Sequence, residues 1–361
     1  MTRISEGSPM ALSPALSGEE AQAAPNPVTG AGEFDARPQA GLQPGLPQYW
    51  YYDHLALPLP ERHGFPRGRF TQVRIAMRVQ GLLLPEQAHD VAPAEWSVLE
   101  RIHTPDYLRN VREGTLSPQA IRELGLPFSP ALVTRARAVV SATVNAAVHV
   151  VRAARTEPST PTVAPRLWAA GVIGGGTHHA FAERGAGYCL FNDIAVAVHV
   201  LRGEGLARRI AVVDLDVHQG NGTAEIFHNE PEVFTFSVHG EKNWPHRKSR
   251  SDFDLGLPDG TGDDAYLDAI QEPLEALFRD FRPEVVFYQA GVDPLATDRL
   301  GRLSLTPQGL RERDRRVFAL CREQGCPVVL TLGGGYSRPP ELSVAAHLNT
   351  VRELAAHCGP C

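Results

Sequence analysis

From residue 167 onward, short apolar runs recur along the chain, and each is followed at once by glycine or ionisable residues. These runs are rich in β-branched residues and span 167–173, 209–213, 232–238, 284–290 and 327–332. Runs this short that are apolar on both faces are typical of buried strands in a parallel sheet. An earlier aromatic run at 49–52 is consistent with one further strand.

Helical patterns fill the intervals between these runs. They predict helices over 130–154, 193–203, 222–228, 264–280 and 308–324. The last helix has recognisable limits, because Thr306-Pro307 precedes it and Gly325 follows it,. Alternating strands and helices predict an α/β fold of three layers, with a central, mainly parallel sheet and helices on both faces.

The first 46 residues differ from the rest of the chain. They are rich in Ala, Pro, Gly and Ser and contain few aromatic or β-branched residues. Such a segment buries too little apolar area to offset the entropy lost on ordering. We therefore expect a disordered extension over residues 1–46 and a single folded domain over residues 47–361.

Composition narrows the classes of function only slightly. The formal net charge of −6 at pH 7 argues against direct nucleic-acid binding. No stretch reaches the roughly 18 consecutive apolar residues that a membrane span needs, so none is expected. The five cysteines are scattered and odd in number, which suits a reducing compartment and predicts a cytoplasmic location.

The residues that follow the five strand-like runs concentrate the candidate chemistry. They are the segments 174–179 (GGGTHH), 214–218 (DLDVH), 239–254, 291–293 (GVD) and 333–336 (GGGY). Ligands of open α/β sheets bind beyond the carboxyl ends of the strands, and parallel strands bring these ends to one rim. We therefore expect histidines, carboxylates and a tyrosine to share one cleft.

The segment 214–218 and Asp293 suggest a metal site. In an extended chain alternate side chains share a face, so Asp214, Asp216 and His218 are expected to point one way. Together with Asp293 from another strand end, Asp216 and His218 give three ligands and leave positions open for water and substrate, as catalytic metal sites do. The alternatives are a capped turn with a surface histidine, and a helix N-cap at Asp293.

His178 and His179 follow three glycines, which let the backbone approach a ligand closely,. Paired histidines on such a turn suit acid–base catalysis. Asp214 is the expected partner that orients one ring, and Asn221 is a neutral partner for the other. The alternative is an ordinary pair of core or surface histidines.

Tyr336 follows Gly333-Gly334-Gly335. A phenol in such a loop suits hydrogen bonding to a carbonyl oxygen as it becomes an oxyanion, and the alternative is a packed aromatic ring. A phosphate-binding loop is disfavoured, because neither glycine triplet carries a GxxxxGK[ST] or GxGxxG pattern.

Taken together, these motifs resemble the histone deacetylase family. They occur in the family's order as GGGTHHA (174–180), GYCLFND (187–193), VVDLDVHQGNGTA (212–224), FSVH (236–239), AGVD (290–293) and LGGGY (332–336). The segments 57–66, 124–130 and 241–263 look like those of the class IV branch and its bacterial relatives. The resemblance covers residue 48 to the end and implies the arginase–deacetylase α/β fold.

Matched position by position, the resemblance implies four groups of site residues. The zinc ligands would be Asp216, His218 and Asp293. The catalytic residues and their partners would be His178, His179, Asp214, Asn221 and Tyr336. The residues in contact with substrate would be Gly187, Tyr188 and Gly334. An inner monovalent cation such as K⁺ would be bound by Asp214, Asp216, His218 and Ser237.

The implied reaction is metal-dependent removal of acetyl or longer fatty acyl groups from lysine side chains of proteins or peptides. Zn²⁺ is the expected ion, and Fe²⁺, Mn²⁺ or Co²⁺ also suit two carboxylates and one imidazole. Asn221 departs from the class I pattern, which has an aspartate there. No acidic rim residue that would hold the substrate backbone is evident.

Three other functions are weighed against this one. A deacylase of small molecules such as acetylpolyamines is disfavoured by the basic residues of segment 241–254. A ureohydrolase with two manganese ions would need more ligands than Gln219-Gly220-Asn221 supplies after His218. A non-enzymatic reader of acyl-lysine would be expected to have lost a metal ligand or the tyrosine.

Overall fold

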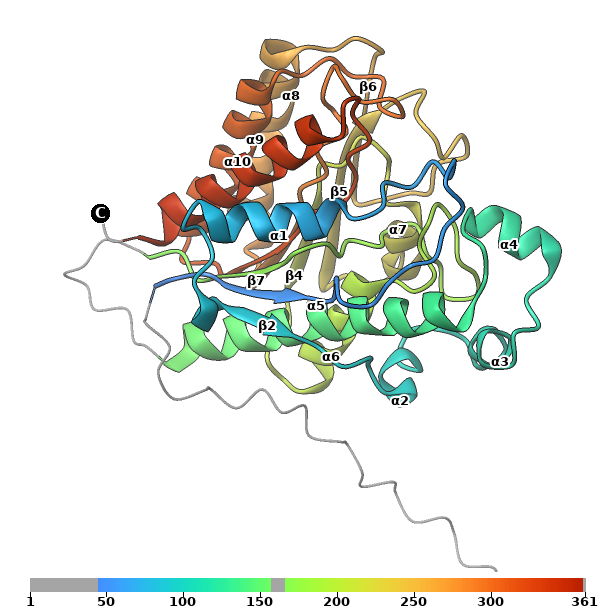
Figure 1. The fold of residues 1–361 in the computed structure, drawn as a ribbon. Coiled ribbons are helices and arrows are strands. Elements are labelled where there is room, and N and C mark those ends of the chain that lie inside the picture. Colours follow the sequence, from blue (N-terminus) through green and yellow to red (C-terminus); the bar gives the residue numbers. More distant parts are fainter. Residues whose placement is uncertain (1–44, 157–165, 360–361) are drawn as a thin grey trace, which may run out of the picture. The chain divides into compact units, whose positions relative to one another are not determined.

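In the computed structural model, which describes residues 45–156 and 166–359, eight strands form one sheet in the order β2-β1-β3-β8-β7-β4-β5-β6 (Figure 1). All neighbouring strands are parallel. The strands are β1 (Gln48–Tyr51), β2 (Ala88–Asp90), β3 (Ala169–Val172), β4 (Ile210–Asp214), β5 (Val233–Gly240), β6 (Phe253–Leu257), β7 (Val285–Gln289) and β8 (Val328–Thr331).

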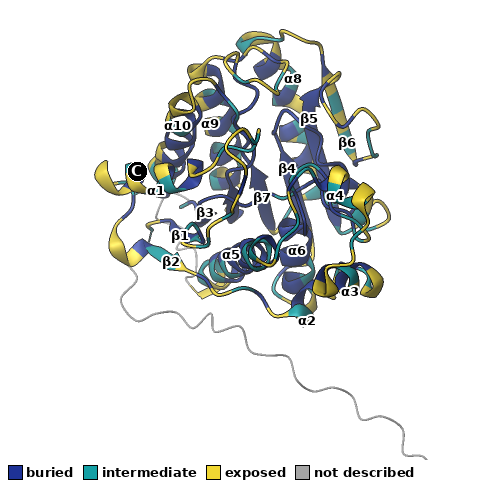
Figure 2. Cartoon of the chain, turned by 45° about the vertical axis from the view of Figure 1, so that its right-hand side comes forward, coloured by how far each residue is buried: buried dark blue, intermediate teal, exposed yellow. Residues whose placement is uncertain are grey.

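The helices cover both faces of this sheet (Figure 2). They are α1 (Arg69–Val79), α2 (Trp96–Leu99), α3 (Pro105–Glu113), α4 (Pro118–Leu124), α5 (Pro130–Thr156), α6 (Asp193–Gly203), α7 (Asn221–Phe227), α8 (Asp263–Ala276), α9 (Pro307–Glu323) and α10 (Glu341–Cys358). Helices α1, α8, α9 and α10 lie on one side, and α5 and α6 lie on the other. The three-layer α/β fold expected from the sequence is confirmed.

The five strands predicted from apolar runs are neighbours in the middle of the sheet, in the order β3-β8-β7-β4-β5. Strands β4 and β7 are buried along their whole length, and full burial of each valine or phenylalanine contributes about 1.5–3 kcal/mol. The missed strands β2 and β6 are the two edges, and both are partly exposed. Their mixed polarity explains why the apolar pattern did not predict them.

The predicted helices correspond to α5, α6, α7, α8 and α9, with end shifts of a few residues. Helices α1, α2, α3, α4 and α10 were not predicted. Two of them, α3 and α4, begin at N-cap residues that the sequence shows. The Thr104 side chain accepts a hydrogen bond from the Tyr107 N–H, and the Ser117 side chain accepts one from the Ala120 N–H. Each cap precedes a proline at the first helical position, a common helix start.

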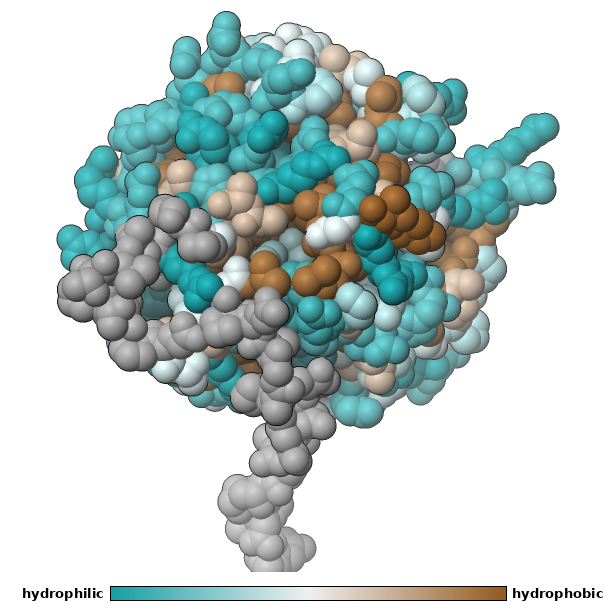
Figure 3. Space-filling model, turned by 60° about the vertical axis from the view of Figure 1, so that its left-hand side comes forward, coloured by the Kyte–Doolittle hydropathy of each residue, from teal (hydrophilic) through white to brown (hydrophobic). Residues whose placement is uncertain are grey.

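The surface shown in Figure 3 is largely hydrophilic, with hydrophobic side chains gathered near the middle of that face. None of the helices in the described ranges combines the length and hydropathy of a membrane span. The expected extension over residues 1–46 lies outside the described residues except for its last two. Its boundary with a single domain over 47–361 stays a prediction.

Candidate active site

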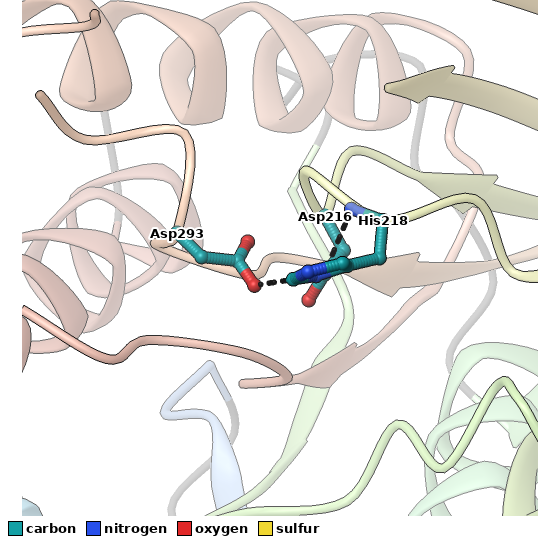
Figure 4. A group of neighbouring side chains, drawn as sticks. All are labelled: Asp216, His218 and Asp293. Carbon is teal, nitrogen blue, oxygen red and sulfur yellow. Dashed lines mark hydrogen bonds and ion pairs between the residues drawn. The ribbon is translucent and has the colours of Figure 1, made fainter. Parts of the chain in front are cut away.

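Asp216, His218 and Asp293 form a tight cluster beyond the ends of β4 and β7 (Figure 4). Their ligand atoms lie within 4.8 Å of one another, and all three side chains are buried. His218 Nδ1 lies 3.1 Å from both Asp216 Oδ1 and Asp293 Oδ2. In the part of the chain that the structure describes, this group has the geometry to hold a metal ion, and it is the ligand set expected from the sequence.

The backbone of the loop after β4 donates hydrogen bonds to the carboxylates of Asp214, Asp216 and Asp293. β4 ends at Asp214, and the chain then bends instead of remaining extended to His218, which corrects the expected extended conformation. The Asp216 N–H donates to Asp214 Oδ1 (3.1 Å), and the His218 N–H donates to Asp216 Oδ1 (3.0 Å). The Val217 N–H donates to Asp293 Oδ1 at 2.9 Å. Asp214 consequently remains outside the metal-ligand group.

Glycines at two other strand ends let these carboxylates approach one another. A Cβ atom on Gly291 would lie 2.1 Å from Asp216 Oδ2. One on Gly334 would lie 1.9 Å from Asp293 Oδ2 and 2.7 Å from Asp216 Oδ2. The Gly334 N–H also donates to Asp216 Oδ2 at 2.8 Å. Gly334, expected to contact substrate, therefore also holds a carboxylate in place.

The buried carboxylates fit a divalent cation. Burial, followed by the negative charge of Asp216, raises the pKa of Asp293 to about 7, although His218 acts in the opposite direction. Two carboxylates this deep in the protein are costly unless positive charge offsets them. A divalent ion among two carboxylates and an imidazole would supply that charge, and these are ordinary ligands of such ions.

The adjacent histidines have different partners. His178 Nδ1 donates to Asp214 Oδ2 at 2.5 Å, and His179 Nδ1 donates to Asn221 Oδ1 at 2.9 Å. Burial lowers the pKa of His178, but the Asp214 carboxylate more than offsets this and raises it to about 9. Burial and the neighbouring His178 hold the pKa of His179 well below its usual value. His178 is therefore the cationic ring and His179 the neutral one.

The glycine loop before the histidines has a backbone that other residues rarely adopt. Gly174, Gly175 and Gly176 have φ angles of +126°, +71° and +76°,. Asp193, at the start of α6, accepts hydrogen bonds from the backbone N–H groups of Gly176 (2.9 Å) and Thr177 (2.7 Å). This role of Asp193 was not predicted from the sequence, although the residue ends the GYCLFND motif.

Tyr336 follows β8 and is fixed through its backbone. Its N–H donates to Asp298 Oδ2 at 2.5 Å, and its ring centroid lies 5.5 Å from the guanidinium carbon of Arg69. Arg69 is buried and donates to the carbonyls of Gly333 (2.8 Å) and Gly335. Desolvation raises the pKa of Tyr336 well above its usual value, so the phenol keeps its proton at neutral pH and is able to donate it in a hydrogen bond.

Gly187 and Tyr188 line a cavity of about 100 Å³ that also borders Asp216, His218, both adjacent histidines and Tyr336. The Tyr188 ring centroid is 6.4 Å from that of Tyr336 and 5.4 Å from that of Phe65. Tyr188 has a positive φ of 70°, and its N–H donates to the Leu124 carbonyl at 2.8 Å. The end of α4 thus holds this aromatic ring beside the cavity.

Trp244, whose role was not predicted from the sequence, lines the wide space in front of the site. Its ring is edge-on to that of His179, with centroids 4.6 Å apart. A Cβ atom on Gly187 would lie 2.6 Å from the indole, so the glycine allows this contact. Trp244 remains 37% exposed, and a tryptophan inside the charged segment 241–254 was the available signal for a binding wall.

Ser237, expected near an inner monovalent cation, lies on β5 directly across from Asp214 on β4. Both side chains are buried. Ser237 Oγ and His239 Nδ1 are joined by a hydrogen bond of 2.9 Å. The expected neighbours are therefore adjacent, while binding of a cation by them stays a prediction.

Arg313 on α9 is fully buried and holds two loops of the site together. Its Nη1 donates to the carbonyls of Leu215 (3.1 Å) and Gly291 (2.7 Å). It also forms an ion pair of 2.8 Å with Asp314, whose Oδ1 accepts from the Tyr288 hydroxyl at 2.5 Å. The role of Arg313 could not be predicted from the sequence, because arginine in a charged helix is usually exposed.

Fold and site together define an α/β protein with a buried Asp-His-Asp group that could hold a metal ion, a histidine pair and a tyrosine at one rim of a parallel sheet. The sequence model of the histone deacetylase domain matches residues 63–351. The chain therefore belongs to the histone deacetylase family, and this membership supports a deacetylase type of hydrolase activity.

Several known proteins are similar to this chain. An uncharacterized protein of Picosynechococcus sp. is 42% identical over 81% of this chain and 93% of its own length. Histone deacetylase 2 of Arabidopsis thaliana is 30% identical over 80% of this chain and 73% of its own. The crystal structure of a histone deacetylase homologue from Aquifex aeolicus superposes with a TM-score of 0.70 at 25% identity, over 86% of this chain and 84% of that one.

Proposed function

We propose that this protein is a metal-dependent hydrolase that removes acyl groups from lysine side chains of proteins or peptides. One observation carries the proposal: Asp216, His218, the histidine pair and Tyr336 all border a single cavity, and Asp293 completes the three-residue group. A reader that only binds acyl-lysine would not need this complete set. Family membership supports the same type of hydrolysis.

Asp216, His218 and Asp293 would hold the ion, and Zn²⁺ is the first choice, with Fe²⁺, Mn²⁺ or Co²⁺ as substitutes. When bound, such an ion supplies a Lewis acid and lowers the pKa of water. Tyr336 would donate a hydrogen bond to the acyl oxygen as it gains negative charge. Asp298 and Arg69 would position Tyr336, since they hold its backbone N–H and its glycine loop.

His179 is the proposed general base. Its Nδ1 is committed to Asn221, so the neutral ring presents Nε2 as a proton acceptor. His178 is cationic beside Asp214, and it favours a neutral His179 and stabilises negative charge in the transition state. The proton taken from water would then pass to the leaving lysine amine.

The apolar part of the cavity favours an acyl chain longer than acetyl. Its volume of about 100 Å³ is several times the roughly 10–15 Å³ that one water molecule requires. Among the apolar side chains that line it are Leu57, Phe65, Leu126, Leu132, Val139 and Leu190. We expect short and medium acyl chains to be accepted, with the binding free energy growing as apolar surface is buried.

The remaining elements of the proposal are a K⁺ ion held by Asp214, Asp216, His218 and Ser237, and a cytoplasmic location. The register of β4 and β5 supports the K⁺ site, because it pairs Asp214 with Ser237. The scattered, odd set of five cysteines supports the cytoplasmic location,.

The test is a hydrolysis assay with metal-reconstituted protein. Acetyl-, octanoyl- and myristoyl-lysine peptides would be compared with acetylpolyamines, and Asp216→Ala and Tyr336→Phe would serve as site variants. We expect turnover of acyl-lysine peptides that Asp216→Ala abolishes and Tyr336→Phe lowers by about 100-fold or more. Turnover of acetylpolyamines alone would favour the small-molecule alternative, and no turnover by metal-loaded protein would reject deacylation of these substrates.

A further inference from the structure

The approach to the candidate active site is a wide, positively charged vestibule. This vestibule has a volume of about 1000 Å³ and shares His179, His218, Tyr188 and Tyr336 with the site itself. Its wall contains the cations Arg122, Arg184, Arg247, Lys248 and Arg250. The carboxylates in the same wall are Glu123 and Glu225. The whole chain carries a formal charge of −6, so positive charge is concentrated here against an acidic background.

Three of these guanidinium groups are available for a ligand. Arg122, Arg247 and Arg250 are exposed, and no ion pair joins them to a carboxylate within the described ranges. Arg184 differs because it is paired with its neighbour Glu183. Unpaired arginines around a concave entrance attract carboxylates, which they can bind in a bidentate manner.

The segment 247–250, which carries three of the five cations of the wall, is held in place by hydrogen bonds. Lys248 Nζ donates to the carbonyls of Asn243 (2.6 Å) and Pro245 (2.8 Å). Gln219, which follows the metal ligand His218, exchanges hydrogen bonds with Ser249 through its side chain, at 2.8 and 2.9 Å. Arg247 and Arg250 therefore project from a segment that is fixed to the active-site loop.

We infer that the vestibule selects acyl-lysine that lies in an acidic peptide segment, with aspartate or glutamate within a few residues of the modified lysine. This inference rests on the proposed function and names its substrate class. The acyl-lysine enters past Trp244 and Tyr188 toward the metal site, while flanking carboxylates meet Arg122, Arg247 and Arg250. A polycationic substrate is repelled by the same groups, and a substrate with neutral flanks gains nothing from them.

The test compares three acetyl-lysine peptides that differ only in flanking residues, which are aspartate, asparagine or lysine, with both peptide ends blocked. Steady-state kinetics would be measured for the metal-loaded full-length protein, for the double variant Arg247→Gln/Arg250→Gln and for Lys242→Gln. Lys242 is the matched control, because it is exposed on the same segment but outside the vestibule wall.

We expect the aspartate peptide to exceed the asparagine peptide by about 5- to 30-fold in kcat/KM, mainly through KM. The ratio should fall toward one in the double variant and at 0.5 M salt, which shortens the Debye length to about 4–5 Å. Lys242→Gln should keep the wild-type ratio. A wild-type ratio of one or less, or a ratio that the double variant leaves unchanged, would overturn the inference.

Binding separates failure of this inference from failure of the proposed function. If no peptide is hydrolysed, titration calorimetry with the same peptides and proteins still decides the charge preference. Tighter binding of the aspartate peptide that is lost in the double variant would support the vestibule even though deacylation had failed. Equal binding of the aspartate and asparagine peptides would reject it.

Discussion

At the scale of single residues, the chemistry of this site is set by partners from distant parts of the chain. His178 and His179 are adjacent, yet one donates to the Asp214 carboxylate and the other to the Asn221 amide. A carboxylate stabilises a cationic ring and an amide does not. The amide of Asn221 therefore leaves His179 neutral, which suits the proposed role of this ring as general base.

The buried Arg313 offers a residue-scale prediction about metal affinity. Lysine in its place keeps the charge, but its single nitrogen cannot lie both at the position of Nη1, beside the Leu215 and Gly291 carbonyls, and at the positions of Nε and Nη2, beside the Asp314 carboxylate,. We expect Arg313→Lys to weaken Zn²⁺ binding by about 10- to 100-fold. Competition of the metal-free protein with a chromogenic chelator measures this affinity directly.

The control for this variant is Arg316→Lys on the same helix. Arg316 contacts Glu312 and the Leu267 carbonyl instead of the metal loops. The Arg316→Lys protein should bind Zn²⁺ as the wild type does. Wild-type affinity in a folded Arg313→Lys protein would show that the metal loops hold their geometry without this guanidinium.

His103 predicts how stability depends on pH. It is buried, its Nε2 accepts from the Asn192 N–H at 3.1 Å, and burial lowers its pKa to about 4 from 6.5. As the pH falls below 6.5, the unfolded chain takes up this proton before the folded protein does, so the free energy of unfolding decreases. This contribution is complete above pH 6.5 and is lost progressively down to about pH 4.

Urea denaturation of metal-free protein at pH 7.5 and pH 5.0 checks this dependence. His103→Gln should lose about 2 kcal/mol less than the wild type between the two pH values. The exposed His246→Gln serves as the control and should follow the wild type. Identical losses in the wild type and His103→Gln would mean that His103 is not held neutral in the folded protein.

At the scale of elements, the strands deliver the site residues and glycine loops let them converge. The ends of β4, β7 and β8 are neighbours in the sheet. The carboxylates of Asp216 and Asp293 lie against Gly291 and Gly334, with no space for a side chain between them. The metal-ligand geometry is therefore a property of three loops together and not of the segment 214–218 alone.

Gly334→Ala should abolish divalent-metal binding, because its Cβ would lie 1.9 Å from Asp293 Oδ2 and must displace that carboxylate or the loop. Calorimetric titration of the metal-free protein with Zn²⁺ measures the loss, and circular dichroism verifies folding. Gly262→Ala is the control, since its Cβ would approach no atom closer than 4.0 Å. A Gly334→Ala protein with wild-type Zn²⁺ affinity would contradict the close-packing argument.

At the scale of the whole molecule, the parallel order of the strands is what turns separate motifs into one site. Strands β3, β8, β7, β4 and β5 are consecutive in the sheet, so the loops that follow them share one rim. The buried Arg313, reaching from α9, joins the loops after β4 and β7. The wide vestibule adds a charged entrance that no single motif encodes.

Removal of residues 1–44 tests the predicted domain organisation. We expect the shortened protein, which still includes β1 from Gln48, to keep the activity, the metal affinity and a Tm within about 2 °C of the full chain. Thermal unfolding measures the Tm, the acyl-lysine assay measures the activity, and titration of the metal-free protein with Zn²⁺ measures the metal affinity. A clearly lower Tm would show that the Ala- and Pro-rich segment contributes to the folded domain.

The sequence alone determined the fold class, the central strands and the group of Asp216, His218 and Asp293 that the structure brings together. These followed from local information, because buried parallel strands are apolar on both faces and ionisable residues mark their ends. The edge strands β2 and β6 were not predicted. Their side chains are of mixed polarity, because an edge strand of the sheet is partly exposed.

Only the tertiary structure decided which partners meet. Asp193, Asp298 and Arg313 act on residues far away in the chain, and no local pattern reports contacts at such separation. The cationic state of His178, the neutral state of His179 and the charge of the vestibule likewise depend on burial and on neighbours brought together by folding,. Local patterns fix elements and residue types, whereas the electrostatics of the site depend on distances that only the packed chain defines.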